Sequence, residues 1–95
     1  MGVRAVALMD SDEVDQTLRA VLRDVLGLPP ERVARFSDAT PLFGALPEFD
    51  SMAVAGLLTE LEERLGMTIE DDEVDAEMLE TYGALLSFTK AKALQ

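Results

Sequence analysis

Apolar residues recur at steps of three and four from Val14 to Leu26, and this period predicts an amphipathic helix. Ser11 or Asp12 can cap its start, because short polar side chains accept hydrogen bonds from the first N–H groups of a helix. Gly27 suits the end of the helix, and Pro29-Pro30 prevents it from resuming. Its inward stripe is formed by Val14, Leu18, Val21, Leu22, Val25 and Leu26.

The segment from Gly27 to Phe49 has no regular period. Connections of this length are uncommon in small domains, and most are functional or packed by their own side chains. We therefore expect an ordered loop, with one helical turn near residues 30–35 or 41–44. Its apolar anchors are Val33, Phe36, Leu42, Phe43, Leu46 and Phe49.

Three further helices are expected after this loop. The first covers about 51–65 and ends at Gly66; the second is short, near 72–79, and follows an acidic run; the third runs from Tyr82 to about Ala93 and is capped by Thr81. For the helix over 51–65, we expect an inward stripe of Ala55, Leu58, Leu61 and Leu65, flanked by Val54 and Leu57.

These elements predict an all-α fold, namely a small bundle of three main helices plus one short helix, with a long ordered loop between helices 1 and 2. The aromatic content of 5% supports helices over a sheet, because the core must consist mostly of Leu, Val, Ala and Met. We assign residues 11–93 to one domain and residues 1–10 to a poorly ordered N-terminal extension.

Composition narrows the function. The chain has neither Cys nor His, which excludes disulfides, His-ligated zinc and Ser-His-Asp triads, so we do not expect an enzyme. A formal net charge of −11 repels nucleic acid and anionic lipid and attracts basic protein surfaces, although it also serves solubility. No apolar run is long enough to insert into a membrane, and we expect a cytoplasmic protein.

The pair Asp50-Ser51 stands where the helix over 51–65 begins, and both residue types cap helices well. A capping box would need Glu or Gln three residues later, where the chain has Ala53 and Val54. We therefore expect Asp50 to cap this helix and the serine hydroxyl to face solvent. A helix N-terminus also stabilises a negative group, so a phosphodiester on Ser51 would lie in a favourable field.

At these residues the chain resembles the acyl carrier protein family. The resemblance covers about residues 11–90 and rests on Phe49-Asp50-Ser51-Met52, Leu57-Leu58, Leu61-Glu62-Glu63-Arg64-Leu65-Gly66 and Ile69-Glu70-Asp71-Asp72. It implies that Ser51 carries 4′-phosphopantetheine, with Asp50 in a supporting role, and that acyl groups ride on this arm as thioesters. The implied partners are a phosphopantetheinyl transferase and enzymes that load or use the acyl group, and a monomer is implied for a carrier that visits several enzymes.

The chain departs from the family after the serine. Met52 replaces the usual Leu, and Ala53 and Gly56 stand where many carriers have carboxylates. We expect Met52, Ala53 and Gly56 to form a weakly charged docking face, although Gly56 equally suits close packing against the long loop. We expect Glu60, Glu63, Asp71 and Asp72 to meet basic groups of partners.

Three alternatives remain open from the sequence. The acidic run 70–77 is either a solvated face or part of a docking surface; it lacks the Gly and Glu of a calcium loop, since Ala76 and Tyr82 occupy those positions, and no metal site is expected. Six apolar residues either form the core or line a space for an acyl chain: Leu58, Leu61, Ile69, Leu79, Tyr82 and Leu86. Finally, the chain could be an unmodified, carrier-like helical module for protein binding or scaffolding.

Overall fold

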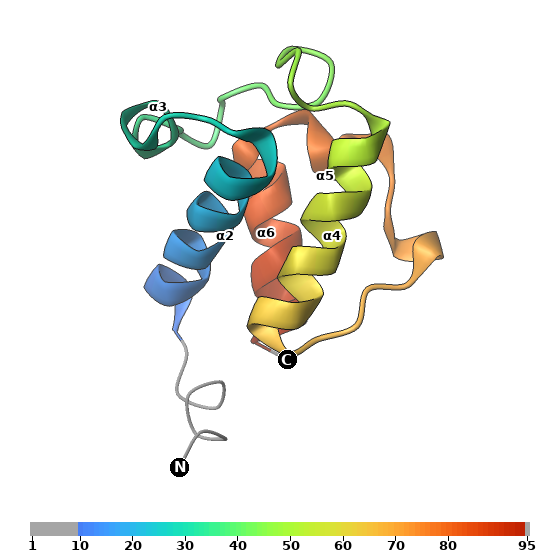
Figure 1. The fold of residues 1–95 in the computed structure, drawn as a ribbon. Helices are drawn as coiled ribbons and strands as arrows, with labels where there is room; N and C mark the ends of the chain where they lie inside the picture. The colour runs from blue at the N-terminus through green and yellow to red at the C-terminus, as the bar shows by residue number, and fades with distance from the viewer. Residues whose placement is uncertain (1–9, 95) are drawn as a thin grey trace.

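The computed structural model describes residues 10–94 and has the all-α architecture that the sequence predicts (Figure 1). The expected N-terminal extension lies, except for Asp10, outside the described residues. Three longer helices stand side by side, and the loop between the first two crosses one end of the bundle (Figure 1). The elements are α2 (Ser11–Leu26), α3 (Pro30–Ala34), α4 (Ser51–Leu65), the 3₁₀ helix η1 (Asp71–Glu73), α5 (Ala76–Glu80) and α6 (Tyr82–Ala93).

Helix α2 begins one residue earlier than expected, because its cap is Asp10 rather than Ser11 or Asp12. The Asp10 carboxylate accepts a hydrogen bond from the Glu13 N–H at 3.0 Å, and the Glu13 side chain accepts one from the Asp10 N–H. This reciprocal arrangement is a capping box, which satisfies two donors at once. Gly27 ends the helix in the left-handed region, at φ 67°, as its position in the sequence suggests.

The acidic segment after α4 differs from the single helix expected over 72–79. It forms the short η1, then extended backbone at Val74 and Asp75, and then α5. Asp75 breaks the helix because its carboxylate accepts a hydrogen bond from the Met78 N–H at 2.9 Å and so starts a new element. Thr81 caps α6 as predicted, by accepting from the Ala84 N–H.

The core lies between α2 and the other long helices. Helix α2 packs against both α4 and α6, whereas α5 packs mainly on α6. The buried side chains of the three long helices are Val14, Leu18, Val21, Leu22 and Leu26 of α2; Leu57, Leu61 and Leu65 of α4; and Tyr82, Leu85 and Thr89 of α6. Within residues 10–94, no helix is long and apolar enough to cross a bilayer.

The long loop is joined to the α5–α6 junction by four main-chain hydrogen bonds. The N–H groups of Leu42 and Phe43 donate to the carbonyls of Glu80 and Leu79, at 2.8 and 3.0 Å. In the other direction, Tyr82 donates to Thr40 at 2.9 Å and Gly83 to Asp38 at 3.0 Å. Because these bonds satisfy backbone groups that would otherwise need water, they fix an irregular segment against the bundle.

The part of the loop that is nearer to α2 is held by hydrogen bonds from the Arg19 side chain. The Arg19 guanidinium binds the Asp15 carboxylate at 3.0 Å and donates to the carbonyls of Val33 and Phe36 at 2.7 and 3.0 Å. It also lies 4.7 Å from the centre of the Tyr82 ring, whose hydroxyl donates to Asp15. Burial raises the pKa of the Tyr82 phenol, and the bond to Asp15 raises it further. One arginine thus links α2, α3 and α6.

The closest approach of the loop to α6 occurs at Gly83. A Cβ atom at this position would lie 2.8 Å from both the Cβ and the carbonyl oxygen of Asp38. We expect Gly83→Ala to lower the free energy of unfolding by about 1–3 kcal/mol, because loop backbone cannot move aside as easily as a side chain. Chemical denaturation followed by circular dichroism measures this change.

Gly56→Ala is the matched control, since Gly56 also lies within a helix. Its added Cβ would meet Val25 Cγ1 at 3.5 Å, an ordinary contact, so we expect stabilisation of up to about 1 kcal/mol from helix propensity. If Gly83→Ala were as stable as Gly56→Ala, the loop would not be held as closely to α6 as described.

Candidate functional site

Ser51 is the first residue of α4 and is exposed. Both Asp50 and Ser51 suit a helix cap, the sequence-based interpretation gives this role to Asp50, and the structure confirms it. The Asp50 Oδ1 atom accepts a hydrogen bond from the Ala53 N–H at 2.9 Å, and the Asp50 carbonyl accepts from the Val54 N–H. Because Asp50 serves as the cap, the hydroxyl of Ser51 is not required for that role.

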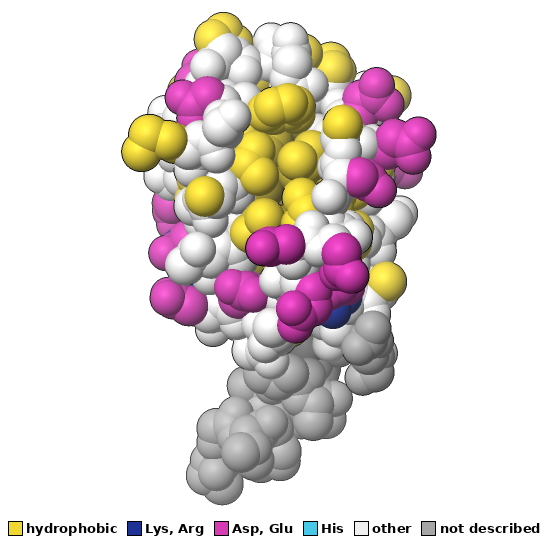
Figure 2. All heavy atoms as spheres, turned by 90° about the vertical axis from the view of Figure 1, so that its right-hand side faces the viewer, with side chains coloured by type: hydrophobic (Ala, Val, Ile, Leu, Met, Phe, Trp, Pro, Cys, Tyr) yellow, Lys and Arg dark blue, Asp and Glu magenta, His cyan; other side chains and the backbone are white. Residues whose placement is uncertain are grey.

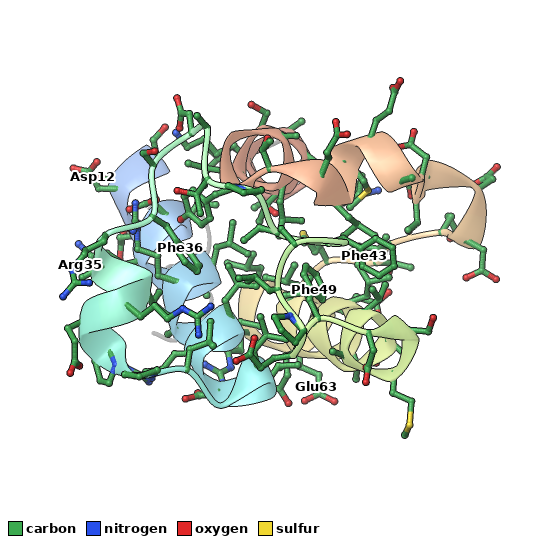
Figure 3. All side chains as sticks on the ribbon, turned by 90° about the horizontal axis from the view of Figure 1, so that it is seen from above. Asp12, Arg35, Phe36, Phe43, Phe49 and Glu63 are labelled. Carbon is green, nitrogen blue, oxygen red and sulfur yellow. The ribbon has the colours of Figure 1, made fainter. Side chains whose placement is uncertain are left out.

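The residues just before Ser51 are anchored in the core. Phe49 is 3% exposed, and its N–H donates to the Leu46 carbonyl at 3.0 Å. The ring of Phe43 meets the ring of Phe49 edge-on, with 5.7 Å between the ring centres (Figure 3). The end of the loop, and with it the start of α4, is therefore fixed by the buried Phe49 ring and its contact with the exposed Phe43 ring.

The inward face of α4 agrees with the expected one at Leu61 and Leu65 and differs from it in the first turns of the helix. Leu57, Leu61 and Leu65 are buried, whereas Ala55 is exposed and Leu58 is only partly buried. The period of three and four is present, but the inward residues before Leu61 were assigned wrongly because the first turns of α4 carry apolar residues on several sides.

The outer surface of α4 is formed by a row of exposed residues that differs from the predicted docking face. Met52, which is 84% exposed, is followed at helical spacing by exposed Ala55, Thr59 and Glu63, and we call these four residues the outer ridge. Glu63 lies on the outer side of α4 (Figure 3). Ala55 and Thr59 were not among the predicted surface residues, although a helical projection centred on Leu61 places both on the outer side of α4.

The structure separates three predicted docking residues from this ridge. Ala53, Gly56 and Glu60 are partly buried, and Gly56 faces Val25 of α2 rather than the long loop. Glu60 forms an ion pair with Arg64 at 2.9 Å. These residues therefore lie toward α2.

Arg64 also ties α4 to α2. Its guanidinium binds Asp24 at 2.9 Å. The hydrogen bonds from Arg64 and then Arg23 hold the pKa of the Asp24 carboxyl below its ordinary value. This side of α4 therefore faces α2, to which it is joined by the Arg64–Asp24 ion pair at the surface.

Asp71 and Asp72 are exposed on η1, in the link between α4 and α5. Their neighbour Glu73 turns inward and binds the Lys92 ammonium of α6 at 2.8 Å, which lowers the pKa of the Glu73 carboxyl. Nearer to α4, the Ile69 N–H donates a hydrogen bond to the Glu62 carboxylate of α4 at 2.7 Å, which fixes the first part of this link. Among the residues that the structure describes, no group of three or more carboxylates is placed to hold a metal ion.

An apolar strip runs down the face of the molecule that Figure 2 shows, and Asp and Glu side chains lie on both sides of it. Of the six residues for which the sequence allowed either a core or a lining role, Leu61, Leu79 and Tyr82 are buried, and Leu58, Ile69 and Leu86 are partly exposed. The first three therefore belong to the core. The last three pack against it and also face outward in part.

Comparisons with known proteins agree on one family. Residues 16–88 match the family model described as "Phosphopantetheine attachment site". An acyl carrier protein of Saccharopolyspora erythraea is 28% identical over 81 residues, which are 85% of this chain and 79% of that protein. The solution structure of a holo acyl carrier protein from Nitrosomonas europaea is similar with a TM-score of 0.73 and 38% identity, over 82% of this chain and 92% of that one.

The division of roles between Asp50 and Ser51 predicts different effects on stability. We expect Asp50→Ala to lower the free energy of unfolding by about 1 kcal/mol through loss of the cap, and Asp50→Asn to retain most of it. Ser51→Ala should change it by less than about 0.5 kcal/mol. Urea titration of the three variants measures this, and a larger loss in Ser51→Ala than in Asp50→Ala would reverse the assignment.

Proposed function

The chain belongs to the acyl carrier protein family, whose members have a phosphopantetheine attachment site, and from this membership we propose that Ser51 carries the 4′-phosphopantetheine arm. The protein is an acyl carrier, and the thiol of its arm holds an acyl group as a thioester. Members of this family are carriers rather than catalysts, and they work with a phosphopantetheinyl transferase and acyl-handling enzymes.

One observation carries the choice of Ser51. The chain has a second serine in almost the same local setting, since Ser11 is the first residue of α2 and directly follows the capping Asp10. The two sites differ in charge: the first turn of α2 contains Asp12 and Glu13, whereas the first turn of α4 contains no acidic residue. A phosphodiester is therefore opposed by neighbouring carboxylates at Ser11 and favoured by the helix N-terminus at Ser51.

The residues around Ser51 supply position rather than chemistry. Asp50 fixes the first turn of α4 through its bond to the Ala53 N–H, and this is the supporting role that we propose for it. The activation of the Ser51 hydroxyl belongs to the transferase, and we propose that this chain catalyses no step itself.

We propose that partners dock on the outer ridge, where Met52 and Glu63 of the predicted docking residues lie. Asp71 and Asp72 are exposed and suited to attract basic groups during encounter. Ala53, Gly56 and Glu60 contribute at the edge of this surface, since they are only partly buried.

We propose that residues 11–93 form the carrier domain and that the protein works as a cytoplasmic monomer without nucleic-acid partners. The net charge of −11 supports the monomer and the absence of nucleic-acid partners, because copies of the chain repel one another and repel phosphate backbones.

Intact-mass measurement tests the attachment directly. We expect the chain, incubated with coenzyme A and a broad-specificity phosphopantetheinyl transferase, to gain the mass of one phosphopantetheinyl group. Ser51→Ala should abolish this gain, and Ser11→Ala, the matched control, should retain it.

The outcomes separate the proposal from its alternatives. A gain that survives Ser51→Ala would place the arm elsewhere on the chain. If several transferases produced no gain on the wild-type chain, the unmodified protein-binding module considered from the sequence would become the better interpretation.

A further inference from the structure

Two of the large apolar side chains that stay exposed within residues 10–94 lie near the start of α4, the helix that begins at Ser51. Met52 follows Ser51 directly and is 84% exposed, and Phe43 of the long loop is 38% exposed. Phe43 contacts the ring of Phe49, which is two residues before Ser51, and this contact places the Phe43 ring near the start of α4 (Figure 3). A third such residue, Leu94, follows α6 at the opposite end of the bundle (Figure 1).

The Phe43 ring is held in place before any partner arrives. Its N–H is bonded to the Leu79 carbonyl, and the preceding Leu42 is bonded to Glu80. Gly44, at φ 91°, turns the chain immediately after it in a conformation that other residues rarely adopt. A side chain that is fixed in advance loses little conformational entropy when it is bound, so it makes an efficient contact.

The charges around Ser51 favour an apolar partner surface over a basic one. The carboxylate next to Ser51 is that of Asp50, which is occupied as the helix cap; the first turn of α4 has no acidic residue, and the next exposed positions of the outer ridge are Ala55 and Thr59. The first carboxylate along the ridge is Glu63, close to the far end of α4. A basic patch placed over Ser51 would therefore find little complementary charge on the ridge nearby.

We propose that Phe43 is an apolar anchor by which enzymes acting at Ser51 hold this chain, together with Met52. This inference rests on the proposed attachment at Ser51, because an enzyme that reaches this hydroxyl must also cover the surface around it. The partner surface then offers apolar pockets to the Phe43 ring and the Met52 side chain. The more distant carboxylates, such as Asp71 and Asp72, assist encounter rather than holding the complex.

Steady-state kinetics of phosphopantetheinylation test this anchor. With a transferase that modifies the wild-type chain, we expect Phe43→Ala to lower kcat/KM about tenfold, mostly through KM, because docking and not chemistry is affected. Phe43→Leu keeps an apolar side chain and should retain most of the activity. Leu94→Ala removes a side chain of similar exposure, 42%, far from Ser51 and should leave kcat/KM unchanged.

Salt dependence separates an apolar anchor from an electrostatic one. Between about 0.05 and 0.5 M salt, we expect the wild-type kcat/KM to fall by less than about threefold, since salt screens charges but not apolar contacts. A fall of about tenfold or more would show that charges hold the complex and would overturn the proposal.

The variants give further decisive outcomes. Circular dichroism and urea titration confirm that Phe43→Ala is folded, and equal kcat/KM for folded Phe43→Ala and the wild type would overturn the anchor while leaving Ser51 as the attachment site. Equal losses in Phe43→Ala and Leu94→Ala would also overturn it. If no transferase modified the wild-type chain, the proposed function would fail first and the anchor with it.

Discussion

The position of Ser51 depends on how the loop between α2 and α4 is tied to the bundle. Such a segment loses much conformational entropy on folding, and its backbone groups need partners. Two sets of polar contacts supply them: Arg19 binds the carbonyls of Val33 and Phe36, and the main chain of residues 38–43 pairs with that of residues 79–83. With the loop fixed in this way, buried Phe49 and capping Asp50 set the start of α4.

The parts of the fold that depend on local pattern could be predicted, and the parts that depend on distant contacts could not. The bounds of α4, the end of α2, both glycine stops and the Thr81 cap follow from local residue types. The close approach of Gly83 to Asp38 has no local signal, because the two residues are far apart in the chain. The inward face of α4 was misjudged because Ala55 and Leu57 are both apolar, and only packing against α2 decides between them.

The candidate site shows the same division. The D-S pair and its helix could be found from the sequence, but the sequence contains a second such pair at Asp10-Ser11. What distinguishes the two is the surroundings: carboxylates in the first turn of α2, and an uncharged first turn with an exposed aromatic ring nearby at α4. The chain thus provides a well-placed attachment point and a docking surface, and the chemistry belongs to the arm and to the enzymes that visit it.

Amide hydrogen exchange, followed by NMR, most directly tests whether the loop is tied down as described. The decisive groups are the N–H donors of Leu42, Phe43, Tyr82 and Gly83, which make the four bonds between the loop and the α5–α6 junction. We expect these four amides to be protected to about the same degree as amides in the middle of α4. Exchange of all four at the rate of an unstructured peptide, while α4 stays protected, would contradict a docked loop and the fixed position of Ser51 that depends on it.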